Sequence, residues 1–159
     1  MSGDCVSKVD REILYLLQKN ARYTATEIGA SIGVSDTTVR NRLRDLEEGS
    51  VVRGYRPIVD YERAGFHRPF HLTCTAPITE RERIAEEAAR IPGVVRVSER
   101  TTGRENLLVE VVGEHADDVT EVARRLDALG ARIEEEAIVR ATYRSPLQHL
   151  APERSTERE

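Results

Sequence analysis

Residues 24–55 read TATEIGASIGVSDTTVRNRLRDLEEGSVVRGY, and this stretch decides the first half of the fold. Thr24 and Ser35 are residue types whose side chains cap the exposed amides at a helix N-terminus. Gly33 and Gly49 stand where each helix would end, because glycine adopts the left-handed backbone of a helix C-terminus without steric cost. The stretch therefore predicts two short helices joined by a tight turn.

The second of these helices has two different sides. Its apolar residues, Val39, Leu43 and Leu46, recur four and three positions apart and so form one stripe. A similar stripe over residues 9–17 adds a third helix to the same small core. Three short helices in this order are typical of a helix-turn-helix, and residues 51–55 are placed to form a small wing. Duplex DNA is therefore the first candidate partner.

Polar side chains that point away from the apolar stripe are the candidate DNA contacts. Arginine pairs bidentately with guanine and asparagine with adenine, and a helix N-terminus attracts phosphate. Arginines after the helix are placed to hold backbone phosphates, which position a protein on DNA without specifying a sequence. The candidate DNA-binding residues are Ser35, Thr37, Thr38, Arg40, Asn41, Arg44, Arg53 and Arg56. The alternative is a three-helix bundle that binds nothing.

The overall charge does not favour nucleic acid. The 159 residues include 24 Lys plus Arg and 28 Asp plus Glu, which gives a net charge of −4. Residues 1–60 alone hold two Lys and seven Arg against nine acidic residues, so this half is neutral rather than basic. The local placement of arginines, and not the net charge, must then provide the attraction for DNA.

The second half of the chain alternates strands and helices. Apolar residues recur at every second position in four segments and at helical spacing in two others. The resulting order β-α-β-β-α-β is that of a ferredoxin-like domain, which makes the whole chain α+β. The expected strands are residues 70–76, 94–101, 106–113 and 133–143, and the expected helices are residues 80–91 and 119–129.

The same alternation places each strand residue on one face of the expected sheet. The apolar face is expected to meet the two helices. It holds Phe70, Leu72, Cys74, Val95, Val97, Leu107, Val109, Val111, Ala137, Val139 and Ala141. The polar face holds His71, Thr73, Thr75, Arg96, Ser98, Arg100, Glu110, Glu134, Glu136, Arg140 and Thr142.

Residues 9–60 resemble the winged helix-turn-helix of the Lrp/AsnC, or feast/famine, transcription regulators of the archaeal type. The resemblance rests on VDREIL at 9–14, GVS at 33–35, the segment 39–47 and the pattern G-x-V-x-x-G-Y at 49–55, and it extends to about residue 147. It implies a sequence-specific DNA-binding regulator. The implied parts are a winged helix-turn-helix at 1–54, a linker at 55–68, a ferredoxin-like effector and oligomerisation domain (RAM or AsnC-type) at 69–147, and a disordered tail at 148–159.

The resemblance also implies a homodimer or a higher homo-oligomer. In such an assembly the polar face of the sheet packs against a second subunit. We then expect Arg96, Arg100 and Arg140 to pair with Glu110, Glu134 and Glu136 across that interface.

A small-molecule effector, such as an amino acid or a related metabolite, is a further implication. In the family, a Gly-Asp-x-Asp turn between the second and third strands helps to bind free amino acids. The corresponding residues here, Gly103, Arg104, Glu105 and Asn106, are the candidate effector-binding residues. Because Arg104 repels an ammonium group and attracts a carboxylate, the site is expected to favour anionic or polar ligands. A plain hairpin turn with surface charges is the alternative.

The sequence contains no catalytic constellation, phosphate-binding loop or metal-ligand spacing, so neither an enzyme nor a cofactor is expected. Two alternatives remain open. Some proteins that look like these regulators decarboxylate sirohaem, and His67, His71, Arg96 and Arg100 keep that reading possible. The other alternative is a metabolite-sensing module without DNA binding.

The two cysteines and the hydropathy of the chain indicate where the protein works. Cys5 and Cys74 lie in different segments, which favours free thiols in a reduced compartment. No apolar run is long enough to span a membrane, and the N-terminus lacks a leader. A cytoplasmic protein without a membrane segment is expected.

Overall fold

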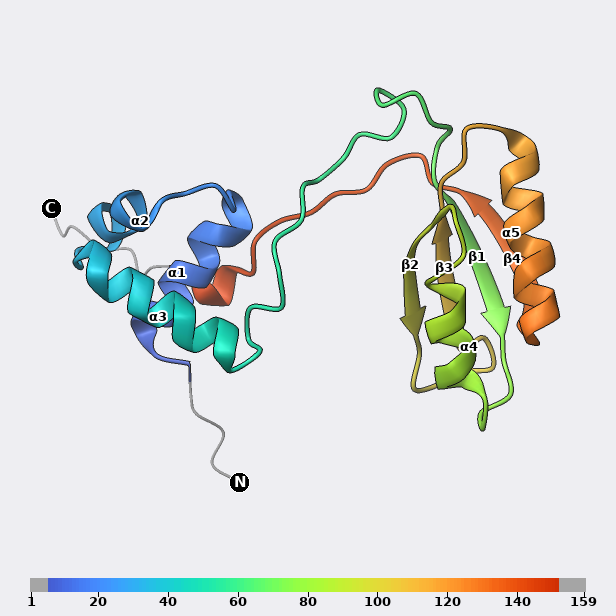
Figure 1. The fold of residues 1–159 in the computed structure, drawn as a ribbon, viewed down its shortest axis with the longest axis horizontal. Helices are drawn as coiled ribbons and strands as arrows, with labels where there is room; N and C mark the ends of the chain where they lie inside the picture. Colours follow the sequence, from blue (N-terminus) through green and yellow to red (C-terminus); the bar gives the residue numbers. More distant parts are fainter. Residues whose placement is uncertain (1–5, 152–159) are drawn as a thin grey trace, which may run out of the picture. The chain divides into compact units, whose positions relative to one another are not determined.

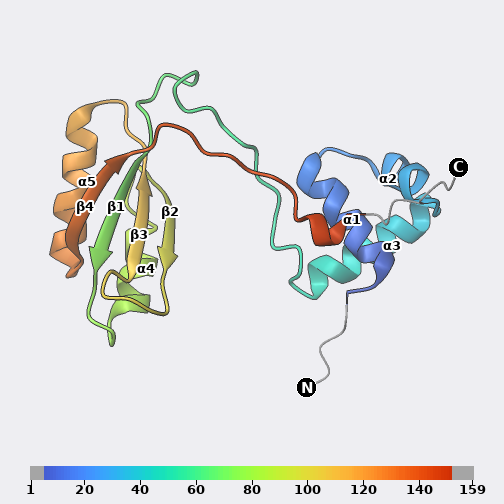
Figure 2. The same cartoon turned by 180° about the vertical axis from the view of Figure 1, so that it is seen from behind.

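The computed structural model describes residues 6–151, apart from the side chain of Ala116. The chain folds into two units (Figures 1 and 2). The helical unit comprises the residues up to Pro57 together with the segment from Tyr143 onward, and the sheet unit comprises Ile58–Thr142. The chain therefore passes between the two units twice.

Three helices surround one small core in the helical unit (Figure 1). They are α1 (Lys8–Lys19), α2 (Ala25–Ile32) and α3 (Asp36–Glu48). Each contributes one fully buried side chain to the centre of the core, namely Ile13, Ile28 and Val39. This arrangement confirms the helix-turn-helix that the apolar stripes predict.

The caps of α2 are those expected from the sequence. The Thr24 hydroxyl accepts the backbone N–H of Glu27 at 3.2 Å, and the Glu27 carboxylate accepts the backbone N–H of Thr24 at 2.7 Å. This reciprocal capping box satisfies amides that have no partner inside the helix. At the other end, Gly33 has φ 76°, so it takes the left-handed conformation that ends the helix and starts the turn.

A glycine inside α2 allows the turn to close. Gly29 is buried, and its carbonyl accepts the backbone N–H groups of Gly33 and Val34 at 2.9 and 3.0 Å. A Cβ atom on Gly29 would lie 2.6 Å from the carbonyl oxygen of Val34, closer than side-chain carbons approach a backbone oxygen. Gly29 is therefore the residue that lets the chain between α2 and α3 pack directly on α2.

The wing expected after α3 forms no β-hairpin. Residues 50–60 contain bends and extended chain but no strand. Instead, the backbone N–H groups of Val51 and Val52 both donate to the carbonyl oxygen of Leu46, at 2.9 and 3.0 Å. These two bonds fold the chain back onto the last turn of α3, so it does not extend into a strand.

The sheet unit has the β-α-β-β-α-β order predicted from the sequence. Its elements are β1 (Phe70–Thr75), α4 (Arg81–Ala88), β2 (Val94–Glu99), β3 (Leu107–Val111), α5 (Ala116–Leu129) and β4 (Arg132–Ile138). The strands pair antiparallel in the order β2-β3-β1-β4. Both helices cover one face of the sheet, and Figure 2 shows the other face uncovered. The core between helices and sheet includes Leu72, Ile84, Val109 and Leu126.

Two irregularities in strand pairing change the predicted sheet faces. In β4 the register shifts so that Glu136 pairs with Leu72 and Ala137 with His71, which reverses the faces expected for these two β4 residues. In β2 the register shifts between Val94 and Arg96, and the side chains that pack on the core are Val94 and Val97 instead of Val95 and Val97. The predicted faces are therefore correct for β1 and β3 and wrong for parts of both edge strands, because a bulge breaks the two-residue alternation.

Charged groups on the uncovered face pair within the chain. Glu110 is buried, and its carboxylate lies 3.1 Å from Arg96 on β2 and 3.9 Å from the imidazole of His71 on β1. Glu134 lies 2.6 Å from Arg132 on its own strand. The pair of Arg96 with Glu110 that was expected across a dimer thus already forms inside one subunit.

The last described segment returns to the helical unit. Gln148–Leu150 form a short 3-10 helix, η1, which packs against α1. The backbone N–H of Leu147 donates to the Gln18 side-chain oxygen of α1 at 3.2 Å. The expected disordered tail therefore begins with an ordered segment, and its remaining residues, 152–159, lie outside the described part of the chain.

Candidate functional site

The N-terminus of α3 is fixed by two hydroxyl groups. The Ser35 Oγ accepts the backbone N–H of Thr38 at 3.1 Å and lies 2.8 Å from the Thr38 hydroxyl. Thr38 is half-buried and engaged with Ser35, whereas Thr37 is exposed. Of the candidate contacts at this end of the helix, Ser35 and Thr37 are thus open to a ligand and Thr38 supports the cap.

The middle of α3 presents its polar candidates to solvent. Arg40, Asn41 and Arg44 are all exposed. Arg40 lies 3.6 Å from the carboxylate of Asp36, and the Arg44 guanidinium donates to the Asn41 oxygen at 3.2 Å. Contacts between exposed side chains on a helix stabilise it by only a few tenths of a kcal/mol, which is less than the energy of a single base contact. These side chains are therefore aligned along the helix yet free to exchange partners.

Arg42 is a residue of α3 that the sequence patterns missed. Its Nε lies 3.8 Å from Asp10 Oδ1, and that buried oxygen has no hydrogen-bond partner among the described residues. The other oxygen of Asp10 accepts the backbone N–H and the hydroxyl of Ser7, at 2.9 and 2.6 Å. One carboxylate thus caps α1 and attracts a cation of α3. The only signal in the sequence is an acidic residue three positions after a serine, which predicts the cap but not the partner.

A tyrosine attaches the chain after α3 to the end of that helix. The Tyr55 hydroxyl donates to the Glu47 carboxylate at 2.8 Å. Burial, the hydrogen bond to Glu47 and the Glu47 charge together raise the pKa of Tyr55 to about 12. Arg53 and Arg56 flank Tyr55 and are exposed, so this bond places both of these candidate phosphate contacts beside α3.

We expect the ionisation of Tyr55 to report on this attachment. Its raised pKa means that the folded chain favours the protonated hydroxyl. The stabilisation of the fold by this protonated group is therefore full below about pH 10, the ordinary tyrosine pKa. It is lost as the pH rises through about 12. The difference in ultraviolet absorbance titration between the wild type and Tyr55→Phe should show a group with a pKa of about 12. In the Glu47→Gln background, the pKa of Tyr55 obtained in the same way should move toward 10. An unchanged pKa in that variant would contradict the assignment.

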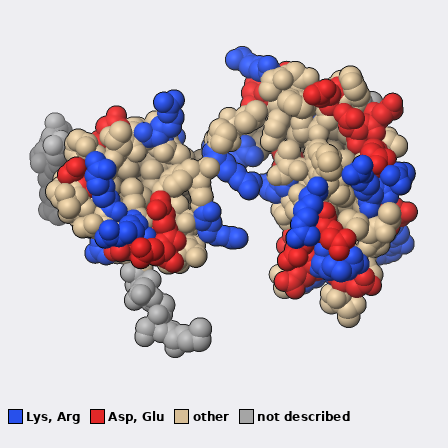
Figure 3. All heavy atoms as spheres, in the orientation of Figure 1, with Lys and Arg blue, Asp and Glu red and all other residues tan. Residues whose placement is uncertain are grey.

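Basic and acidic groups are mixed on the surface of the helical unit. Figure 3 shows Lys and Arg side chains next to Asp and Glu side chains on the visible face, without a single continuous basic area. This agrees with the neutral charge of the first 60 residues. Attraction to DNA then depends on individual exposed arginines.

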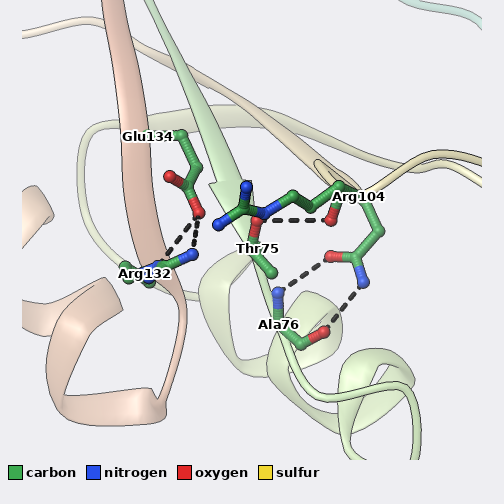
Figure 4. Close-up of polar contacts among 6 residues, drawn as sticks. Thr75, Ala76, Arg104, Arg132 and Glu134 are labelled. Atoms are coloured by element: carbon green, nitrogen blue, oxygen red, sulfur yellow. Dashed lines mark hydrogen bonds and ion pairs between the residues drawn. The ribbon is translucent and has the colours of Figure 1, made fainter.

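The loop between β2 and β3 lies against the end of β1. Gly103 has φ 101°, so it takes a positive backbone angle that the turn requires. The Thr75 hydroxyl donates to the backbone oxygen of Arg104 at 3.2 Å, and Figure 4 shows the Arg104 side chain extending toward Thr75 and Glu134. The Thr75 hydroxyl and Arg132 hold the pKa of Glu134 below its usual value, and the Arg104 charge adds to this. The loop thus brings the Arg104 guanidinium toward a carboxylate that already pairs with Arg132 on β4.

Asn106 has a structural role that the sequence comparison with the family turn did not suggest. It is 4% exposed, its amide oxygen accepts the backbone N–H of Ala76, and its amide nitrogen donates to the Ala76 carbonyl, both at 2.8 Å. Figure 4 shows these two bonds at Ala76. Both halves of the amide are therefore occupied by backbone, which removes Asn106 from the side chains that a ligand can reach. Gly103, Arg104 and Glu105 are exposed.

Replacing Asn106 with aspartate should destabilise the sheet unit by about 1–3 kcal/mol, because the Ala76 carbonyl would face a buried carboxylate instead of an N–H donor. The loss should shrink at acidic pH, where a protonated aspartic acid regains a donor. Thermal unfolding of both proteins as a function of pH measures this. Glu105→Gln, an exposed neighbour, is the matched control; an equal loss in the control, or no loss in Asn106→Asp, would refute the role.

Other candidate chemistries find little support in the described residues. Residues 6–151 bring no three His, Cys, Asp or Glu side chains together as metal ligands. Cys74 is a buried free thiol whose pKa is raised to about 11, mainly by burial, so it is unreactive. Cys5 lies outside the described part. In the same part of the chain, every helix is too short or too polar to cross a bilayer.

The fold and the exposed side of α3 define a helix-turn-helix regulator, and comparisons with known proteins agree. Residues 7–47 match the family model described as an AsnC-type helix-turn-helix domain. The transcriptional regulator LysM of Saccharolobus solfataricus is 30% identical over 129 residues, which cover 81% of this chain and 87% of that protein. The transcriptional regulator FL11 of Pyrococcus horikoshii is 24% identical over 126 residues, which cover 79% of this chain and 81% of that protein.

A solved structure shows the same fold. The feast or famine regulatory protein of M. tuberculosis, complexed with L-methionine, has a TM-score of 0.78 and 22% identity over 92% of this chain and 99% of that one. The chain belongs to the Lrp/AsnC family of helix-turn-helix transcriptional regulators. The relatives are regulators and not enzymes.

Proposed function

We propose that this regulator binds specific duplex DNA sequences in the cytoplasm, with α3 in the major groove. The observation that carries the proposal is the exposed row of Arg40, Asn41 and Arg44 on a helix whose opposite side is buried. Arg40 and Arg44 are suited to guanine and Asn41 to adenine. The amides capped by Ser35 sit at the positive end of the helix and favour a phosphate.

The test is a selection of bound fragments from a pool of random duplexes, followed by titration of the enriched sequence. We expect a defined motif whose binding weakens steeply as salt concentration rises. Recovery of no common motif, with equal binding to all duplexes, would reject sequence-specific recognition.

We propose that the uncovered face of the sheet joins two subunits. Strand pairing places Leu108 and Ala137 on this face beside the Arg96, Glu110 and His71 cluster. An uncovered sheet face that contains apolar residues is suited to burial in an interface. Two copies would place two α3 helices on successive turns of DNA, about 34–36 Å apart. A monomer in sedimentation at micromolar concentration would reject this assembly.

We further propose that the exposed part of the β2–β3 loop, Gly103, Arg104 and Glu105, lines an effector site for anionic ligands. L-Methionine is bound by the M. tuberculosis relative, which motivates a ligand response here. The exposed Arg104 replaces an acidic residue of the family turn, and Arg132 lies near the same carboxylate of Glu134. Two guanidinium groups beside one carboxylate leave positive charge for a ligand carboxylate.

Calorimetric titration with a panel of small dicarboxylates checks this proposal. Arg104→Ala should weaken the binding roughly 10-fold or more, because one charge-assisted contact is lost. Arg100→Ala, which removes an arginine directly after β2, is a control for net charge. Dicarboxylate binding that survives Arg104→Ala undiminished would place the ligand elsewhere.

A further inference from the structure

Hydrogen-bond donors and acceptors on the exposed side of α3 are not equally free. The side-chain oxygen of Asn41 accepts from the Arg44 guanidinium at 3.2 Å, so the acceptor of this amide is already engaged. Asn41 is exposed, and the two N–H groups of the same amide remain available to a ligand. The Asn41–Arg44 pair therefore offers donors to DNA, and its acceptor is turned inward.

The carboxylate of Asp36 is the other acceptor beside this part of the helix. Its Oδ2 lies 3.6 Å from Arg40 Nη2, and its Oδ1 accepts from the Thr37 hydroxyl at 3.4 Å. Both oxygens therefore face donors of the same helix. Base contacts of a helix-turn-helix come from the N-terminal part of its recognition helix. The remaining acidic residues of α3 lie within its last four positions and are Asp45, Glu47 and Glu48.

A surface that offers donors discriminates among the edges of the bases. In the major groove guanine presents two acceptors, N7 and O6, and thymine presents one, O4. Adenine and cytosine each present an amino group, which is a donor. A guanidinium has five N–H groups, so Arg44 keeps further donors after its bond to Asn41. A keto base, meaning guanine or thymine, can therefore meet Asn41 and Arg44 while the bond between them stays intact.

Adenine would require the two side chains to separate. Asparagine binds adenine through its oxygen as well as its N–H group, and the oxygen of Asn41 is the atom that Arg44 holds. If the pair stays intact, the amino group of adenine meets only other donors and loses its hydrogen bond to water without replacement. The intact pair also orients both side chains before DNA binds, which lowers the entropy lost on binding.

We propose that Asn41 and Arg44 read keto bases as one unit of donors, and that Arg44 prevents Asn41 from selecting adenine. This role rests on the proposed entry of α3 into the major groove and gives that site a base preference. On the contacted strand guanine ranks first, thymine second, and adenine and cytosine last, because they offer two, one and no keto oxygen or ring-nitrogen acceptors free of a neighbouring amino group. Asn41 without its neighbour would favour adenine.

The test compares the motifs that the full-length wild type, Asn41→Ala and Arg44→Ala select from random duplexes. The base pair whose preference relaxes in Asn41→Ala is the one that Asn41 reads. In the wild type, adenine in place of the keto base at that position should weaken binding roughly 10-fold or more. In Arg44→Ala the Asn41 oxygen is released, so the preference there should change toward adenine. Arg124→Ala on α5 is the charge control and should leave the ranking of bases unchanged.

The results distinguish a failure of this role from a failure of DNA recognition itself. Both substitutions place alanine at exposed positions of a helix, so the fold should persist. Adenine ranked first at the Asn41 position in the wild type overturns the role, as does a motif that Asn41→Ala leaves unchanged or a ranking that Arg44→Ala does not alter. Each of these results still leaves sequence-specific binding in place. Recovery of no common motif by the wild type would reject the proposed function and this role together.

Discussion

Gly29→Ala is expected to lower the free energy of unfolding of the helical unit by about 1–3 kcal/mol, because the added methyl group overlaps a backbone oxygen. That oxygen, on Val34, would lie 2.6 Å from the new Cβ and belongs to the turn itself. It cannot move aside as a flexible side chain does, so α2 and α3 must separate. In a unit of this size each kcal/mol lowers Tm by roughly 4–8 °C.

The loss should appear as a lower Tm of the helical unit and faster hydrogen exchange of α2 amides, together with weaker DNA binding. Thr26→Ala, on the exposed side of the same helix, adds no contact and should leave Tm unchanged or slightly higher. If both variants behave alike, the close approach at Gly29 does not limit the packing of the two helices.

The second large effect is expected at Arg40. Arg40→Ala should reduce discrimination between the selected DNA motif and a single-base variant by about 1–3 kcal/mol, or roughly 5- to 150-fold. Binding to unrelated duplexes should change much less, because a base contact contributes little there. Competition titrations with a panel of single-base variants identify the base pair that Arg40 reads.

Arg56→Ala provides the contrast to Arg40. It should weaken binding to all duplexes alike and reduce the slope of log K against log salt by about 1, as expected for the loss of one phosphate contact. Arg124→Ala, on α5 of the sheet unit, removes the same charge far along the chain from α3 and should change neither quantity. Loss of discrimination in Arg56→Ala, or a reduced salt slope alone in Arg40→Ala, would contradict these roles.

Local signals explain why much of the fold was predictable. Thr24, Ser35 and Gly33 act through contacts within four residues, so their types and spacing suffice to place α2 and α3. The order of strands and helices was predictable for the same reason. The faces of β2 and β4 were not, because a bulge depends on pairing with a distant strand and leaves no mark in the alternation.

The candidate site likewise contains residues that local patterns predict and contacts that they do not. The exposed Arg40, Asn41 and Arg44 follow from the apolar stripe on the other side of α3. The pair of Arg42 with Asp10 joins residues 32 positions apart, and Asn106 joins Ala76 across 30 positions. Such contacts arise only when the elements pack, so the sequence showed the residues without their partners.

The chain returns to α1 through η1, and this return determines where the protein can be divided to make hybrids. In sequence terms the sheet unit is an insertion, Ile58–Thr142, within a helical unit made of two separate stretches. A hybrid regulator that takes its sheet unit from another member of the family should therefore exchange this central insertion alone. It should keep the segment from Tyr143 to Ala151 together with its own α1, because the Gln18 side chain accepts the backbone N–H of Leu147.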